Sequence, residues 1–343
     1  MPVLYARLGR GWVMSRIKLS HGGGGEDSWK LIREIFLKYF SNPHLNRLED
    51  SAVLDVGSKI AFTTDAFTVK PIHFKGGNIG KLAIAGTVND LAVMGAKPMY
   101  ISVSFIIEEG FLLDELELIV KSMKEEADKT GVLVVAGDTK VVPKGSADGI
   151  FISTSGIGQV LFEGLSASNV KPGDVLIITG SIGDHGACIL AEREGFEIDV
   201  ESDCNSLWDL VEAILSTGAQ VHAMRDPTRG GLSAVLHEWA QASKVSFIVE
   251  EERIPIKEPV LGLCELLGLE PYHLASEGRI VIAVKEEDAN KVLDVLKYKN
   301  LEGFSVIGRA VSSEKKPEVL LKTPYGTYRY LEPPAGELLP RIC

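Results

Sequence analysis

The sequence predicts an α/β (α+β) protein with two mixed-sheet domains, and three observations support this class. A chain of 343 residues is longer than one ordinary core requires and fits two domains. Hydrophobic residues make up 45% and charged residues 24%, which is the balance of a folded globular protein. Strand-length apolar runs alternate with helical patterns in both halves, as expected of mixed sheets covered by helices.

In the first half, this alternation starts after a glycine run at 21–25. Trp29, Ile32, Phe36 and Phe40 recur at helical spacing and predict a first helix. The following elements are expected in order: β-rich runs over 52–69, a helix of small residues over 79–94, a buried strand over 98–107, a helix that opens at Asp114, a strand over 132–136 that ends in Gly137-Asp138, and a strand over 150–160.

The second half follows an inter-domain turn that Pro172-Gly173 marks best. Strands are expected over 175–179, 245–249 and 279–284, and helices over 184–193, 227–239 and 287–296. The proline-containing tail shows no period, so no folded element is expected there. The predicted organisation is a flexible segment 1–44, a first domain 45–165, a second domain 166–325 and a flexible tail 326–343.

Composition narrows the functional classes. The net charge of -11 argues against a surface for nucleic acid or for an anionic membrane. The 4 cysteines are far apart and form no CxxC pair, which argues against a zinc knuckle or a disulfide framework and suits a reducing cytoplasm. No apolar run is long enough to span a membrane. We therefore expect a cytoplasmic protein.

Aspartates recur at the ends of apolar runs in the first half. Asp50, Asp65, Asp90 and Asp138 each stand near Thr, Asn, Ser or Gly. Carboxylates at strand ends collect at one edge of a sheet, where their repulsion calls for a cation, and hard oxygen ligands select Mg²⁺. Any single Asp is equally explained as a turn or cap residue. Taken together, the four favour a cation site.

Two glycine-rich stretches are candidate phosphate sites, although the sequence contains no Walker A loop. The nearest candidate, KGGNIGKL, has a glycine one position too late and Leu82 in place of Ser or Thr. In TGSIGDHGA, His185 stands between glycines that favour an anion site, a close turn, or both. The first stretch could wrap phosphates or act as a linker, and comprises His21, Gly22, Gly23, Gly24 and Gly25.

The stretch RDPTRGGL is ambiguous. Asp226 before Pro227 is a good helix N-cap and needs no ligand to explain it. Arg229 supplies a charge for phosphate, and Gly230-Gly231 lets a ligand approach the backbone.

Three further residues each have two possible interpretations. Lys140 is either a solvated lysine or a phosphate contact, Glu277 is a turn acid or a base, and Cys343 is either accidental or functional.

Together these segments resemble the PurM (aminoimidazole ribonucleotide synthetase) superfamily. The motifs EDSAVL, TTDAF, NDLAVMGA, GDTKVV and DPTRGGL are similar to that superfamily. HGGGG, GSIGDHG and PRIC are most similar to its HypE family of hydrogenase-maturation carbamoyl dehydratases. The resemblance runs from about His21 to Cys343. One departure is Glu49, where many relatives have a second Asp.

The resemblance implies N-terminal strands that form a barrel across a homodimer, with ATP in a cleft between the domains. It implies Mg²⁺ held by Asp50, Asp65, Asp90 and Asp226. It implies ATP contacts from His21, Gly22, Gly23, Gly24, Gly25, Asp138, Arg229, Gly230 and Gly231.

The implied chemistry takes place on Cys343. HypF places a carbamoyl group on this thiol, ATP phosphorylates the carbamoyl oxygen, and loss of phosphate leaves a thiocyanate. The cyano group then passes to iron on a HypC–HypD complex and becomes the cyanide ligand of [NiFe] hydrogenase. Lys140 is expected to stabilise charge, Glu277 to act as base, and His185 to contact the tail or nucleotide.

Two alternatives remain open from the sequence. One is another ATP-using superfamily member: selenophosphate synthetase, thiamine-phosphate kinase or a purine-pathway ligase. Selenophosphate synthetases carry a reactive Cys or selenocysteine in the N-terminal glycine-rich segment, whereas here no Cys precedes Cys188. The other is a non-catalytic scaffold for maturation partners that uses nucleotide only structurally.

Overall fold

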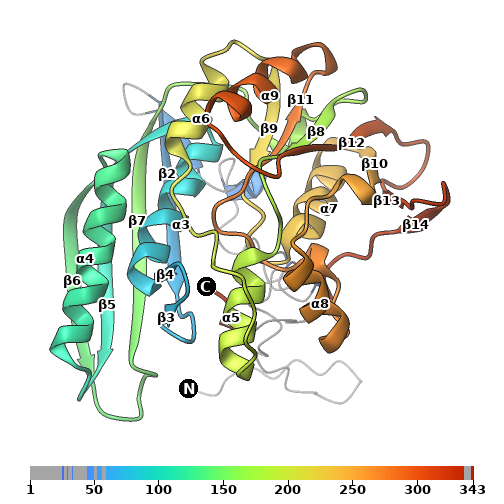
Figure 1. Cartoon of the computed structure of the whole chain (residues 1–343). Coiled ribbons are helices and arrows are strands. Elements are labelled where there is room, and N and C mark those ends of the chain that lie inside the picture. Colours follow the sequence, from blue (N-terminus) through green and yellow to red (C-terminus); the bar gives the residue numbers. More distant parts are fainter. Residues whose placement is uncertain are drawn as a thin grey trace, which may run out of the picture.

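The computed structural model describes residues 25–26, 29, 33, 45–49, 52–55, 59–335 and 341–343 (Figure 1). Asp50 and His21 to Gly24 lie outside the described residues, as does most of the helix expected from Trp29 onward. Within the described residues, no helix combines the length and the apolar character that crossing a bilayer requires.

The first domain contains an open five-stranded sheet in the order β1-β2-β7-β5-β6. Its strands are β1 (Ala52–Asp55), β2 (Lys59–Phe67), β5 (Ala96–Glu108), β6 (Leu133–Val142) and β7 (Ile150–Val160), and a small hairpin pairs β3 (His73–Phe74) with β4 (Gly77–Asn78). The β5–β6 pair is parallel, and the other neighbours are antiparallel. Strand β6 lies at one edge, and its residues from Leu133 to Val141 are exposed.

Helices α3 (Ile79–Val93) and α4 (Leu113–Thr130) cover this sheet (Figure 1). Asn78 caps α3, because its Oδ1 accepts hydrogen bonds from the backbone N–H groups of Gly80 and Lys81 at 2.9 and 3.0 Å. Helix α3 is buried almost all round, since it contacts the sheet on one side and the second domain on the other. Its small side chains permit this double packing, and they place Asn89 and Asp90 between the domains.

The second domain is built on a seven-stranded sheet in the order β14-β13-β10-β12-β8-β11-β9. The strands are β8 (Val175–Ile178), β9 (Val221–Arg225), β10 (Val245–Glu250), β11 (Val281–Val284), β12 (Ser305–Ser312), β13 (Val319–Lys322) and β14 (Tyr328–Tyr330). The helices are α5 (Asp184–Glu194), α6 (Trp208–Leu215), α7 (Gly231–Ser243), α8 (Glu258–Leu267) and α9 (Ala289–Tyr298). The 3₁₀ turns are Leu45–Arg47, Ala167–Asn169, Glu251–Arg253, Pro271–His273 and Glu286–Asp288.

Both faces of this second sheet are buried. Leu176 and Ile178 of β8 pack in one core with Trp239 of α7. Ile177 faces the opposite way, into a core that includes residues of α6 and α9 and continues into the first domain. Alternate residues of one strand therefore supply two cores, which explains why this stretch of the sequence is apolar without interruption.

The α/β class is confirmed, and several elements begin and end close to their predicted positions. The strand at 150–160 agrees, and the helix expected over 79–94 ends at Val93. Other expectations were wrong. Helices α6 and α8 were not predicted, and neither were strands β3, β4, β9, β12, β13 and β14.

Further differences concern the aspartates and the sheet. Strand β6 continues through Asp138, Asp65 lies within β2, and Asp90 lies inside α3, so none of the three follows a strand end as expected. Strand β5 alternates buried and exposed residues instead of being wholly buried. The sheet is open in the single chain, so a barrel would require a second copy. The domain boundaries at 45, 166 and 326 stay predictions.

A prediction follows from the contact between α3 and α4. An added Cβ on Gly80 would lie 2.3 Å from the backbone oxygen of Ile119 and 2.9 Å from Met123 Cγ. Gly80→Ala must separate the two helices, so it should lower the free energy of unfolding by about 1–3 kcal/mol. Gly262→Ala is the matched control, because nothing lies within 4 Å of that Cβ.

In the control, a helical alanine replaces a helical glycine, which should raise the free energy of unfolding by up to about 1 kcal/mol. Chemical denaturation of the two variants measures both values. Equal stability of the two variants would contradict the close packing of α3 on α4.

Candidate active site

Three carboxyl groups gather between the domains. Asp65 comes from β2, Asp226 from the segment between β9 and α7, and Glu277 from the segment before β11. Burial raises the pKa of Asp226 to about 6. Burial, together with Asp226, Asp65 and Asp203, raises the pKa of Glu277 well above its usual range, and Glu277 Oε1 is a buried oxygen without a hydrogen-bond partner. Such crowding of acids is typical of functional sites.

Arg229 supplies positive charge to this carboxyl cluster. Its pKa is raised above the usual value by Cys343 first, and further by Asp65, Glu277 and Asp90, against the opposing effect of burial. The guanidinium therefore interacts with groups from β2, from α3, from the segment before β11 and from the tail. One cation thus balances several acids that lie far apart in the sequence.

Asn89 fixes the position of Glu277 relative to the first domain. Its side-chain amide donates hydrogen bonds to the backbone oxygens of Asn205 and Glu277, at 3.1 and 3.2 Å. Its Oδ1 accepts one from the backbone N–H of Leu207 at 2.8 Å. This fully buried residue thereby connects α3 to two segments of the second domain. Sequence reasoning missed it, although it stands directly before Asp90 in NDLAVMGA.

The tail enters the same region. We use "tail tip" for Arg341, Ile342 and Cys343, which lie near α5 (Figure 1). Burial raises the pKa of the Cys343 thiol to about 12, with Arg229 opposing the shift and Glu277 and Asp65 adding to it. The thiol is therefore protonated near neutral pH. In this position its sulfur lies within the electrostatic reach of Arg229 and the carboxyl cluster.

His185 contacts the tail tip from α5. The ring is fully buried, which lowers its pKa to about 4, so the imidazole is neutral near pH 7. Nε2 lies 2.8 Å from the carbonyl oxygen of Ile342, and Nδ1 lies 2.7 Å from Ser202 Oγ. A carbonyl oxygen only accepts, so Nε2 carries the proton and Nδ1 accepts from Ser202. The structure thus gives His185 a tail contact, while a catalytic part for it stays a prediction.

Glycines of the stretches TGSIGDHGA and RDPTRGGL allow close packing of backbone segments. A Cβ on Gly186 would lie 2.9 Å from the backbone nitrogen of Ala275, and one on Gly231 would lie 2.5 Å from the backbone oxygen of Tyr272. Gly230 and Gly231 both have positive φ, at 78° and 61°. Helix α7 begins at Gly231, so interpreting Asp226-Pro227 as its N-cap was wrong. The Asp226 carboxyl is instead part of the buried cluster.

Lys140 and Asp138 do not join the cluster within one chain. They lie on β6, opposite Ile106 and Ser104 of β5, and both are exposed. Gly25 is the described member of the glycine run, and it is buried. It lines a cavity of about 960 Å³ whose walls also include Trp29, Arg47, Arg225, Glu238 and Pro334.

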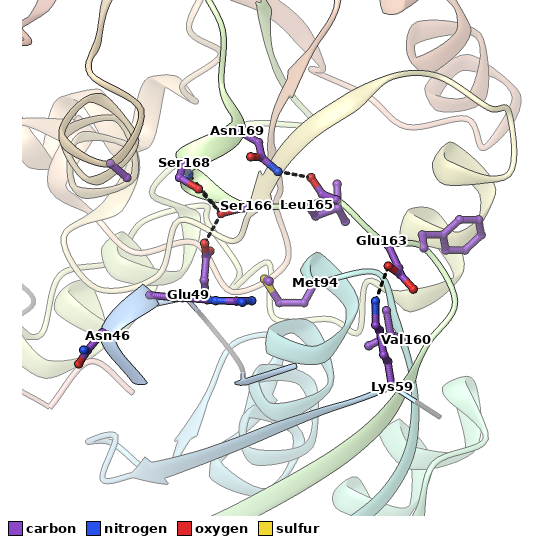
Figure 2. Close-up of a pocket in the computed structure, with 14 residues that line it drawn as sticks. Asn46, Glu49, Lys59, Met94, Val160, Glu163, Leu165, Ser166, Ser168 and Asn169 are labelled. Atoms are coloured by element: carbon purple, nitrogen blue, oxygen red, sulfur yellow. Dashed lines mark hydrogen bonds and ion pairs between the residues drawn. The ribbon is translucent and has the colours of Figure 1, made fainter. Parts of the chain in front are cut away.

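A second cavity, of about 670 Å³, lies where the end of α3 meets the segment that links the domains. Figure 2 shows Lys59 and Glu163 of its wall joined by an ion pair of 2.7 Å, and Glu49 bonded to Ser166. Glu49 thus takes a structural contact where relatives were expected to have a second Asp. Asp65, Asp226 and Glu277 line neither of the two cavities, and the larger one comes next to the cluster through Arg225, the neighbour of Asp226 in the chain.

The described residues contain no ready-made group of three or more His, Cys, Asp or Glu with the geometry of a metal site. Asp90 Oδ2 accepts a hydrogen bond from Thr63 Oγ1 at 2.7 Å, and Asp50 lies outside the described residues. Mg²⁺ in nucleotide sites usually has only one or two carboxylate ligands, the remainder being water and phosphate oxygens. The buried acids Asp65 and Asp226 fit that smaller role.

Comparison with known proteins identifies the family of this chain. Residues 48–160 match the family model "AIR synthase related protein, N-terminal domain", and residues 171–319 match the corresponding C-terminal domain. Carbamoyl dehydratase HypE of Rhodobacter capsulatus is 44% identical over 96% of this chain and 98% of its own length. The protein of the same name from Escherichia coli K12 is 43% identical over 96% of this chain and 100% of its own.

Solved structures extend the likeness to the fold. A crystal structure of a HypE–HypF complex contains a chain with TM-score 0.84 and 46% identity, covering 89% of this chain and 99% of that one. HypE in complex with ATP gives TM-score 0.81 and 43% identity over 95% and 99% of the two chains. The chain therefore belongs to the HypE family of the AIR synthase-related proteins.

Proposed function

We propose that this protein is an ATP-dependent carbamoyl dehydratase that acts on a carbamoyl group carried by its own Cys343. The observation that carries this proposal is the position of Cys343, which is half-buried and lies within electrostatic reach of Arg229, Asp65 and Glu277. Its relatives are named carbamoyl dehydratases, and one was solved with ATP. The product is a thiocyanate, which supplies the cyanide ligand of [NiFe] hydrogenase.

The reaction balances as two steps. The carbamoyl oxygen attacks the γ-phosphorus of ATP, an O–P bond forms, ADP leaves, and the nitrogen loses one proton. The C–O bond then breaks as phosphate leaves, and the nitrogen loses its second proton to give S–C≡N. Glu277 is the proposed acceptor of these protons, because it is a buried carboxyl beside the sulfur with an unpartnered oxygen.

The raised pKa of Glu277 sets a condition on this role. In the arrangement described here the protonated form of the carboxyl is favoured, because burial and three neighbouring acids oppose its charge. A base must start as carboxylate, so an additional positive charge has to enter the cleft before proton transfer. Mg²⁺, held by Asp65 and Asp226 together with Asp50 and Asp90, would supply part of it.

We place ATP in the cavity of about 960 Å³, whose size suits a nucleotide. Its lining residue Gly25 belongs to the glycine run His21 to Gly25, and Arg225 directly precedes Asp226. The phosphates would then point from the cavity toward the carboxyl cluster. Arg229 is the proposed phosphate contact, and the backbone at Gly230 and Gly231 the surface that the nucleotide approaches.

A homodimer would complete the site. Strand β6 exposes Leu133, Val135 and Val141, at 59%, 60% and 63% of their surfaces, on an open edge of the sheet. Apolar edges of this kind are normally covered by a partner. A second copy against this edge would form the barrel and bring Lys140 and Asp138 toward the cleft of its neighbour. Lys140 would there stabilise charge on the transferred phosphoryl group.

The partners follow from the chemistry of the tail. HypF is the proposed carbamoyl donor, since a relative was solved in a HypE–HypF complex. A HypC–HypD complex is the proposed acceptor of the cyano group. In the docked position the half-buried Cys343 thiol is protonated and is a poor nucleophile, so the tail would leave the cleft to be loaded and return to it for dehydration.

Replacing the carrier sulfur is the first test. Cys343→Ser should still bind ATP, since the nucleotide cavity does not include Cys343, but it should gain no stable carbamoyl group from HypF and carbamoyl phosphate. Intact mass spectrometry reports both the carbamoyl adduct and the later loss of one water. Cys264→Ser is the matched control and should be modified normally. A carbamoyl group on Cys188, Cys204 or Cys264 would refute the assignment.

Removing the proposed base is the second test. Glu277→Gln keeps the size and the buried position of the side chain but cannot accept a proton, so dehydration should slow by about 10²–10⁴-fold. ATP binding and loading by HypF should continue, and mass spectrometry should show the carbamoyl adduct accumulating. Glu270→Gln is the control outside the cluster. Normal dehydration by Glu277→Gln would assign the base elsewhere.

Mixing two inactive variants tests whether Lys140 acts across the dimer. Lys140→Ala and Glu277→Gln homodimers should both be inactive. If Lys140 serves the neighbouring cleft, an equal mixture after subunit exchange should regain about one quarter of wild-type activity, because half the dimers are mixed and each has one intact site. If Lys140 serves its own cleft, both sites of every mixed dimer are defective. No recovery after verified exchange would therefore exclude the dimer assignment.

A further inference from the structure

The tail tip adds to the first domain in the manner of a short antiparallel strand. The backbone N–H of Thr68 donates to a main-chain oxygen of Cys343 at 2.9 Å, and the N–H of Lys70 donates to the Arg341 oxygen at 3.3 Å. Thr68 Oγ1 adds a second contact to the same Cys343 oxygen at 3.3 Å. Thr68 and Lys70 directly follow β2, so the tail extends the edge of an existing element.

Helix α5 contacts the tip from the other side. Arg193 Nη2 donates to the Arg341 oxygen at 2.9 Å and to the Lys70 oxygen at 2.8 Å, so one guanidinium joins the tail to its neighbouring segment. His185 Nε2 donates to the Ile342 oxygen at 2.8 Å. Each of the three consecutive residues of the tip therefore has a bonded main-chain oxygen, and two of the donors are side chains of α5.

The side chains of Arg341 and Ile342 anchor the tip. Arg341 donates to Asp148 at 2.5 Å and to the backbone oxygen of Thr68 at 2.8 Å. Ile342 is 5% exposed and packs into the main core. The contacts to the carbonyl oxygens do not involve the Cys343 side chain. The same bonds can therefore form whether the sulfur carries a proton, a carbamoyl group or a cyano group.

We propose that His185 and Arg193 are positioning residues that bind the tail through its main-chain carbonyl oxygens and so hold the Cys343 sulfur at the carboxyl cluster. The proposal rests on the proposed function only in treating the sulfur as the reacting position. In the docked state, main-chain oxygens of the tip accept hydrogen bonds from side chains of α5. Recognition is therefore independent of the group that the sulfur carries.

The experiment measures the exposure of the Cys343 thiol in the full-length protein, without ATP or HypF. A pulse of iodoacetamide followed by peptide mass spectrometry gives the alkylation rate at Cys343. His185→Ala and Arg193→Ala should each raise this rate about tenfold, the typical effect of one lost hydrogen bond to a buried group. His185→Gln retains a donor near the Nε2 position and should restore most of the protection.

His222→Ala is the control, because His222 is a largely buried histidine that is hydrogen-bonded to Asp174 at 2.7 Å but does not touch the tip. Circular dichroism shows which variants remain folded. If His185→Ala fails to fold, Arg193→Ala still decides the question, since its side chain is only partly buried. Wild-type protection in a folded Arg193→Ala protein would overturn the proposal. So would His185→Gln alkylation as fast as that of His185→Ala.

This test separates the positioning role from the proposed reaction. Alkylation of Cys343 needs neither nucleotide nor carbamoyl group. If protection depends on His185 and Arg193 while wild-type protein shows no dehydration, the proposed function fails and the docking stands. If dehydration proceeds while protection is unaffected in both variants, the docking proposal fails and the function stands.

Discussion

The interior of this protein depends on the balance between Arg229 and the acids around it. Asp65, Asp90 and Glu277 reach Arg229 from elements that are distant in the sequence, and Cys343 reaches it from the tail. Without that charge, the buried carboxyl groups would repel one another with no compensation inside the fold. The same residue thus stabilises the junction of the two domains and marks the place where a phosphate could be accommodated. Arg229 therefore serves both the stability of the domain junction and the proposed chemistry.

In the proposed reaction, Cys343 has one role in the docked position and another outside the cleft. Attack on an external donor requires thiolate, and burial suppresses this form by raising the thiol pKa to about 12. Inside the cleft, the sulfur can only present what it already carries. Outside the cleft, a thiol with an ordinary pKa would be available for loading. The environment, rather than a change in the residue itself, determines which of the two roles the sulfur performs.

The sequence predicted the elements with strong local signals and missed those set by distant contacts. Helix α3 is a long run of mostly small and apolar residues, β7 is a β-rich run, and both were placed almost correctly. Asp226-Pro227 has the local pattern of a helix start, yet α7 begins at Gly231, where backbone atoms of Tyr272 and Leu274 leave no room for a side chain. Tertiary packing had displaced the helix start, which no local pattern records.

In the candidate site, too, some residues could be predicted from the sequence and others could not. The carboxyl groups of Asp65, Asp226 and Glu277 meet, although the expected reason, strand ends at one sheet edge, was wrong. Asn89 was missed because its partners, Asn205, Leu207 and Glu277, lie in the other domain. Nothing in the neighbourhood of Asn89 in the sequence identifies these partners. The resemblance supplied residue types, whereas the folded chain supplied their contacts.

The exposed edge strand β6 has a consequence for the single chain. In a newly made single chain, one edge of this ten-residue strand has unpaired backbone groups, and Val134, Val135 and Val141 are exposed. Such an edge is a template for unwanted strand addition. Dilute or partly synthesised chains would be exposed to aggregation and proteolysis until that edge is covered. Its cellular abundance would therefore depend on how quickly the edge is covered as well as on folding.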